Sequence, residues 1–130
     1  GSTETNTGGN SDSIPVYKPI TIGGASVELC FNNSNGEYNK LGNRQYIKLD
    51  ITTNGSYSFT ANGQSAGDDP DVLVYQQGVA VFRSEENGDE SFNQTLNAGT
   101  YVLEVYEWLN VDGNDQTSKS TCVDVSASAN

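Results

Sequence analysis

Four short β-prone runs joined by turn residues fill the stretch from residue 68 to residue 108, and this pattern restricts the possible folds more than any other feature. The runs are Asp71–Gln76, Val79–Ser84, Ser91–Leu96 and Thr100–Trp108. The first is almost continuously apolar, as expected of a strand that is buried on both faces. Gln77 and Gly78 form a tight turn after it, and an acidic loop and an Asn-Ala-Gly turn separate the later runs. The stretch therefore predicts four consecutive strands.

The remainder of the chain continues this β pattern. Further strands are predicted at Val16–Ile22, Ala25–Phe31, Gln45–Ile51, Ser56–Ala61 and Lys119–Ser126. Pro19 cannot donate a ladder hydrogen bond, so the first of these is expected at a sheet edge. No window combines the apolar period of a helix with helix caps. The sequence thus predicts an all-β fold, an antiparallel β-sandwich or jelly roll of about eight or nine strands.

A single folded domain is expected from a chain of 130 residues. Gly1 and Ser2 resemble a cloning remnant, and residues 3–13 are polar and rich in Gly, Ser, Thr and Asn, which suits a flexible linker. We therefore expect residues 1–13 to be a linker and residues 14–130 to form the domain.

The chain is strongly acidic, with 17 acidic and 6 basic residues and a net charge of −11. This balance argues against nucleic acid and anionic membranes as partners, because phosphate binding needs clustered Lys and Arg. No apolar run is long enough to insert into a membrane. The acidity favours cation binding, and its simpler explanation is a solvated surface on a secreted protein.

The two cysteines, Cys30 and Cys122, fall on the polar faces of two predicted strands, and each lies two residues from an acid, Glu28 or Asp124. Two such strands paired side by side would bring both sulfurs to one outer face, within reach of a disulfide. The alternative is a pair of free thiols in a reduced, cytosolic protein. A bond across the separation of 92 residues (122 − 30) would contribute about 4–5 kcal/mol in chain-entropy models.

Carboxylates crowd into the two loops that flank one predicted hairpin. Since only the hairpin separates these loops, they lie at the same end of the sheet. Carboxylates brought together must be neutralised, hydrated or protonated, and Ca²⁺ takes about six to eight oxygen ligands. We predict a Ca²⁺ site formed by Asp71, Glu90, Asp68, Asp69 and Asp89. The alternative is that these side chains extend into water or cap the amides of their own turns.

Two large aromatic residues, Tyr106 and Trp108, share a strand face with Glu104. If that face is turned to solvent, the rings form a binding platform for a protein or sugar ligand. If it packs on the other sheet, they belong to the core. The pattern favours the core for Tyr106 and exposure for Trp108, which ends the strand.

The order of these elements resembles the bacterial pre-peptidase C-terminal domain, a β-sandwich module found beside the catalytic domains of secreted peptidases. The similar features are Asp71 opening an apolar run, the Asn-Gly-Asp-Glu loop at 87–90, and the Leu-x-Ala-Gly-Thr-Tyr-x-Leu-x-Val segment at 96–105. Upstream, residues 44–61 resemble the preceding strand pair of that family. Asp71 and Glu90 match the Asp and Glu of the family pattern.

Collagenase collagen-binding domains are related to this family in fold, and the resemblance implies calcium. Their ligands come partly from an acidic segment before the first strand. Residues 3–15 of this chain hold only Glu4 and Asp12 as acids, so that particular site does not carry over residue by residue.

The sequence lacks most of the groups that a catalytic site needs, because it has no histidine and paired cysteines would leave no thiol nucleophile. We therefore expect no enzymatic activity. The resemblance implies a secreted accessory domain of a bacterial peptidase, whose partners are the parent catalytic domain and an insoluble, collagen-like protein. Its role would be secretion, maturation or substrate attachment. The alternative is a carbohydrate-binding or adhesin module, with a polysaccharide as its partner.

Overall fold

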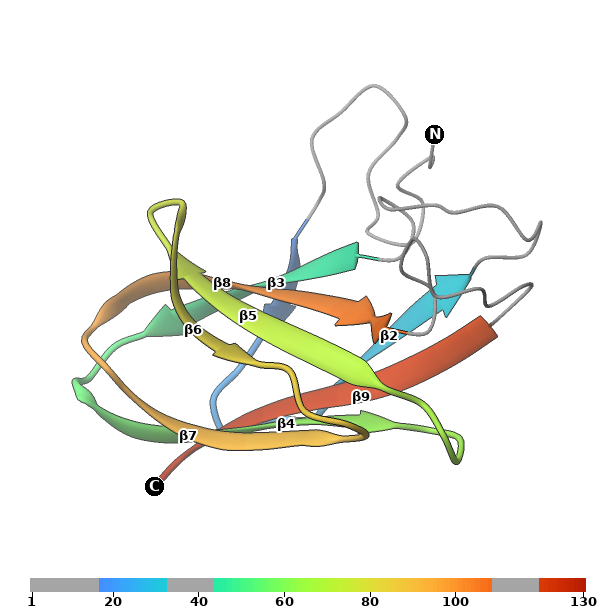
Figure 1. The fold of residues 1–130 in the computed structure, drawn as a ribbon. Helices are drawn as coiled ribbons and strands as arrows, with labels where there is room; N and C mark the ends of the chain where they lie inside the picture. The colour runs from blue at the N-terminus through green and yellow to red at the C-terminus, as the bar shows by residue number, and fades with distance from the viewer. Residues whose placement is uncertain (1–16, 33–43, 109–119) are drawn as a thin grey trace.

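The protein folds as a two-layer β-sandwich, which confirms the predicted all-β class (Figure 1). A computed structural model describes residues 17–32, 44–108 and 120–130. These ranges contain nine strands and no α-helix, so none of them provides a helix that could cross a membrane. The predicted linker at residues 1–13 lies outside the described residues, as do the predicted strand ends at Val16 and Lys119.

Five strands form the first sheet and four form the second. The first sheet has the order β1 (Lys18–Ile20), β3 (Arg44–Ile51), β8 (Gly99–Glu107), β5 (Pro70–Gln76) and β6 (Val79–Ser84). The second has the order β2 (Val27–Asn32), β9 (Ser120–Ala129), β4 (Gly55–Gly63) and β7 (Glu90–Leu96).

One described strand pair departs from the purely antiparallel prediction. Strand β1, at the edge of the first sheet, pairs with β3 in parallel, whereas the other described pairs are antiparallel. After β1 the chain crosses to the second sheet as β2 and then returns as β3. No hairpin joins β1 to β3, so the tight turn that would impose an antiparallel direction is absent from this pair.

The core lies between the two sheets and is built by strict alternation along the strands. Strand β3 contributes Ile47, Leu49 and Ile51, and strand β4 contributes Phe59 and Ala61, all of them buried. These residues are the ones whose spacing of two predicts an inward face. Strand β5 differs, because Pro70 to Val74 are all buried. This continuous burial confirms the prediction of a strand covered on both faces.

The hairpin of β5 and β6 places two distant loops at one end of the sandwich. Its turn residues Gln77 and Gly78 have φ angles of +52° and +79°, the left-handed pair of a type I′ turn. The turn sits at one end of the hairpin, so the start of β5 and the end of β6 meet at the other. There, Pro70 and Asp71 pair with Glu107 and Tyr106 at the end of β8.

A disulfide joins Cys30 of β2 to Cys122 of β9, as predicted from the strand faces. The two residues are directly opposite in the antiparallel register, with their Cα atoms 4.0 Å apart. Glu28 and Asp124 face each other in the same register, and the side-chain amide of Gln64 donates to both carboxylates, at 2.7 and 3.1 Å. The bond therefore cross-links the first strand of the second sheet to the last strand of the chain.

Removing the disulfide should destabilise the fold strongly. We expect the double variant Cys30→Ser/Cys122→Ser to lose about 3–5 kcal/mol of unfolding free energy, because the unfolded chain regains the freedom of a long closed loop. Urea denaturation of the variant and of the oxidised wild type measures the difference, and thiol titration of denatured wild type should find no free thiol. Two titratable thiols in the wild type, or equal unfolding midpoints, would contradict this assignment.

Candidate metal site

Three carboxylates converge at the end of the sandwich where β5 and β7 begin and β8 ends. Asp69 precedes β5, Asp71 is its second residue, and Glu90 opens β7 after the loop at 85–89. Each of the three places one carboxylate oxygen within 4.8 Å of the others. Asp71 is 4% exposed and Glu90 is fully buried, whereas Asp69 is partly exposed. We call these three residues the acidic cluster.

Hydrogen bonds orient two members of the cluster and leave one oxygen of the third, Asp71, without a partner among the described residues. The backbone amide of Glu86 donates to Glu90 at 2.8 Å, and the hydroxyl of Ser84 donates to the same carboxylate. The backbone amide of Gly88 donates to Asp69 Oδ1 at 3.0 Å. Asp71 Oδ1 is buried and accepts no hydrogen bond from any residue in the described part of the chain. An unsatisfied buried acceptor costs about 1–3 kcal/mol, and a bound cation would remove that cost.

The last residue of β8 and the residue that follows it hold Asp69 in place through its backbone. The amide of Asp69 donates to the carboxylate of Glu107 at 2.8 Å, and the amide of Trp108 donates to the carbonyl of Asp69 at 3.0 Å. Gly88 reaches the side chain of Asp69 with a φ of +81°, a conformation that glycine adopts without steric cost. These hydrogen bonds thus hold the segment that contains Asp69 against the buried carboxylates of the cluster.

The electrostatics of the cluster favour either a proton or a cation. Burial, followed by the neighbouring charges of Asp69 and Glu90, raises the pKa of Asp71 to about 7. Burial also raises the pKa of Asp69 and of Glu90 above the ordinary carboxylate range. Carboxylates forced together in a partly dry site resist full ionisation. Three oxygen donors of this kind match the ligand preference of Ca²⁺.

The structure brings together three of the five predicted ligands. Asp68 is buried and accepts a hydrogen bond from the amide of Ser65 at 3.0 Å. Asp89 is exposed and accepts one from the amide of Gly63 at 2.9 Å. Both are outside the acidic cluster and cap backbone amides instead, which was the alternative considered for acids in these turns.

Glu107 is a site residue that sequence reasoning missed. It is fully buried, and its carboxylate accepts from the amide of Asp69 and, at 3.3 Å, from the hydroxyl of Thr121. A signal was available, because Glu107 follows Tyr101, Leu103 and Val105 at the spacing of two that marks the inward face of β8. A carboxylate at an inward position is costly without partners, so it indicates a structural contact.

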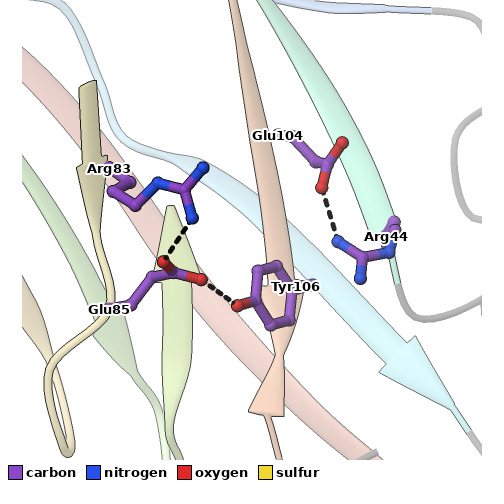
Figure 2. Close-up of polar contacts among 5 residues, drawn as sticks. All are labelled: Arg44, Arg83, Glu85, Glu104 and Tyr106. Atoms are coloured by element: carbon purple, nitrogen blue, oxygen red, sulfur yellow. Dashed lines mark hydrogen bonds and ion pairs between the residues drawn. The ribbon is translucent and has the colours of Figure 1, made fainter. Parts of the chain in front are cut away.

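Tyr106 and Trp108 have different environments, and only Tyr106 lies in β8, which ends at Glu107. Tyr106 is 7% exposed, but it does not belong to the core cluster that lies between the two sheets. Figure 2 shows its hydroxyl donating to Glu85, and the guanidinium of Arg44 lies 4.5 Å from the centre of its ring. Trp108 is 45% exposed. The predicted division between the two rings is therefore confirmed, but Tyr106 is buried under Arg44 and Glu85 and not against the second sheet.

A pocket of about 380 Å³ opens beside the cluster. It is lined by Asp69, Asp71, Glu85, Glu86, Asn87, Tyr106 and Trp108. Arg83 pairs at 3.4 Å with Glu85, one of the lining residues (Figure 2), and the rings of Tyr106 and Trp108 belong to the lining. The exposed indole and the buried carboxylates thus line one open space.

The comparisons with known proteins establish the fold. The sequence matches no protein-family model and no curated protein. The pre-peptidase C-terminal domain of collagenase from Bacillus anthracis has a TM-score of 0.56 and 12% identity, covering 85% of this chain and 95% of that chain. PliG from Aeromonas hydrophila, a periplasmic inhibitor of g-type lysozyme, has a TM-score of 0.55 and 14% identity, covering 88% and 96%.

A third similar structure is CorA, a surface-associated copper-binding protein of Methylomicrobium album BG8. Its TM-score is 0.58 and its identity 10%, covering 87% of this chain and 97% of that chain. At such identities the likeness concerns the sandwich alone. These neighbours are mostly non-catalytic domains and binding proteins.

The raised pKa of Asp71 predicts an unusual pH dependence in metal-free protein. Between its ordinary pKa of 3.8 and its folded value of about 7, folded Asp71 keeps a proton that the unfolded chain has released. This contribution to stability is therefore lost as pH rises through that window. We expect Asp71→Asn, which removes the charge at constant size, to melt above wild type at pH 7 in EDTA, and the difference to shrink toward pH 4.

Thermal melts across this pH range measure the effect. Asp50→Asn is a matched control, because Asp50 is exposed at the far end of β3 and accepts only a hydrogen bond from Thr100, at 2.8 Å. A constant difference between wild type and Asp71→Asn at all pH values would show that Asp71 does not retain its proton.

Proposed function

We propose that this chain is a non-catalytic, Ca²⁺-binding accessory domain of a secreted bacterial peptidase, of the pre-peptidase C-terminal type. The observation that carries the proposal is the convergence of Asp69, Asp71 and Glu90, with a buried Asp71 oxygen that has no hydrogen-bond partner within residues 17–32, 44–108 and 120–130. Asp71 and Glu90 are the two acids that match the family pattern. The likeness of the fold to a collagenase pre-peptidase C-terminal domain supports the same assignment.

A location outside the cytoplasm agrees with two features of the molecule. The Cys30–Cys122 disulfide joins directly opposed strands, and structural disulfides persist in oxidising compartments. The neighbour PliG is periplasmic and CorA is surface-associated. We infer that residues 14–130 are the folded module and residues 1–13 a linker, so that the domain is tethered to a catalytic partner and attaches it to an insoluble substrate protein.

The role of the ion would be to close the acidic end of the sandwich. Asp69, Asp71 and Glu90 would hold it, each with at least one oxygen, and the remaining positions of a Ca²⁺ ion would be filled by water or by further oxygens. An ion bound there would connect the start of β5 to the start of β7. Since only the folded chain assembles this set of ligands, binding would stabilise the fold.

Calcium should raise the melting temperature of the wild type. At a hundredfold excess over Kd, an ion that binds only the folded state adds about 2.7 kcal/mol. Differential scanning calorimetry with EDTA, with millimolar Ca²⁺ and with Mg²⁺ as a control for screening measures the shift. Glu90→Gln and Asp71→Asn should abolish it.

The neighbouring acid Asp89 provides a matched control for this experiment. It lies one residue before Glu90 but binds the amide of Gly63 and is outside the cluster. Asp89→Asn should therefore retain the Ca²⁺ response. Identical melting temperatures of the wild type in Ca²⁺ and in EDTA would contradict the calcium site, and the acids would then be ordinary turn residues.

Attachment to an insoluble protein is the expected activity. We expect the domain to be retained on insoluble collagen without releasing soluble fragments, because the chain has no histidine and its two cysteines are bonded to each other. Pull-downs on collagen, chitin and cellulose test this, with analysis of the supernatant for hydrolysis. The exposed ring of Trp108 favours a second candidate, a carbohydrate-binding or adhesin module. Retention on chitin or cellulose but not on collagen would select that candidate.

A further inference from the structure

The pocket beside the acidic cluster combines negative charge with an exposed aromatic ring. Four of its seven lining residues are carboxylic acids: Asp69, Asp71, Glu85 and Glu86. Trp108, a residue that is 45% exposed, lines the same pocket, and its backbone amide donates a hydrogen bond to the carbonyl of Asp69. Carboxylates beside an indole form the usual environment of a cationic group, because both attract positive charge.

A buried oxygen in this pocket has no partner of its own. Asp71 is 4% exposed, it lines the pocket, and its Oδ1 accepts no hydrogen bond. A carboxylate in this condition is stabilised by a positive ligand nearby, whether an ion in the acidic cluster or a charged donor from outside. The pocket therefore contains a buried acceptor that a positively charged ligand would stabilise, in addition to its solvated acids.

The charge of the pocket stays negative after the neutralising groups are counted. The described ion pair at its edge is Arg83 with Glu85, at 3.4 Å, and the side chain of Arg83 is 63% exposed. A divalent cation in the cluster would offset two charges among five nearby carboxylates, those of the pocket and Glu90. The remaining potential favours a cationic ligand over a neutral or anionic one.

The same face of β8 already binds one guanidinium within the chain. Arg44 lies over the ring of Tyr106, 4.5 Å from its centre, and pairs with Glu104 at 2.5 Å (Figure 2). Trp108 directly follows β8 and lines the same pocket as Tyr106. An arginine from outside would use the same combination of aromatic ring and carboxylate just beyond the end of the strand.

We propose that this pocket binds an arginine or lysine side chain of a protein partner, with its cation on Trp108 and against the carboxylates of Glu86 and Asp69. Arginine is preferred, because its planar guanidinium stacks on an indole and donates to two acceptors at once. The inference rests on the proposed attachment role and names the chemistry of the partner, an exposed basic side chain on a protein surface. It adds a binding site beside the acidic cluster, and the two sites share only the carboxylate of Asp69.

The single tryptophan of the chain makes the test direct, since intrinsic indole fluorescence reports Trp108 alone. The probe is a short arginine-containing peptide, and its control is the same peptide with citrulline, a neutral analogue of the same shape. We expect a saturable fluorescence change with the arginine peptide, weakened by added salt, and none with the citrulline peptide. The titration is run in Ca²⁺ and in EDTA.

Two variants locate the site. Trp108→Ala should weaken peptide binding about tenfold in calorimetry, the loss expected for a cation–π contact. Glu86→Gln should weaken it about threefold at low salt. Glu28→Gln is the matched control, because Glu28 is an exposed acid on β2, hydrogen-bonded to Gln64, and should bind the peptide like wild type.

The outcomes separate this inference from the proposed calcium site. Calcium-dependent melts without arginine-peptide binding would overturn the inference and leave the calcium site standing. Peptide binding without a calcium effect would support the inference and remove the ion. Equal binding of the citrulline peptide, or a fluorescence response to soluble oligosaccharides in place of the arginine peptide, would overturn the cationic partner.

Discussion

The end of strand β8 is the constraint on which the acidic face of the molecule depends. Three consecutive residues there contact the two acidic loops: Tyr106 holds Glu85 through its hydroxyl, Glu107 accepts the amide of Asp69, and the amide of Trp108 donates to the carbonyl of Asp69. Strand β8 lies between β3 and β5 in the first sheet, so its position follows from core packing. The rigid centre of the sandwich thereby fixes surface loops that would otherwise separate under their mutual repulsion.

This arrangement is energetically costly because it buries carboxylates. Asp68, Asp71, Glu90 and Glu107 are all nearly inaccessible to water, and each ionised group would need partners to offset its lost hydration. Glu107 and Glu90 have backbone and hydroxyl donors, whereas Asp68 and Asp71 each retain one oxygen without a partner among the described residues. A cation at Asp69, Asp71 and Glu90 would offset this cost without rearranging the fold. The same negative potential extends into the pocket at Trp108, so ion binding and recognition of a basic side chain would share one electrostatic origin.

Strand periodicity in the sequence predicted the features that depend on which face a residue occupies. It did not predict which hydrogen-bond partners the side chains in the loops have. Alternation placed Cys30 and Cys122 on one outer face, and the pairing of β2 with β9 confirmed their disulfide. The sequence also placed the two acidic loops at one end of the sheet, because a single hairpin separates them. It could not distinguish Asp69 from Asp68 and Asp89, since all three lie in turns where a carboxylate can bind an amide as readily as a cation. The burial of Tyr106 under Arg44 likewise depends on the register between β3 and β8, which joins residues 62 positions apart (106 − 44).

Sensitised terbium luminescence tests the central claim most directly, because Tb³⁺ replaces Ca²⁺ at oxygen sites and accepts energy from a nearby indole. The chain has one tryptophan, and it lines the pocket that also contains Asp69 and Asp71. With selective excitation of the indole, we predict a saturable Tb³⁺ emission that Ca²⁺ displaces, that Glu90→Gln abolishes and that Asp89→Asn preserves. Absence of sensitised emission from the wild type, or an emission that Glu90→Gln leaves unchanged, would contradict a cation site at Asp69, Asp71 and Glu90.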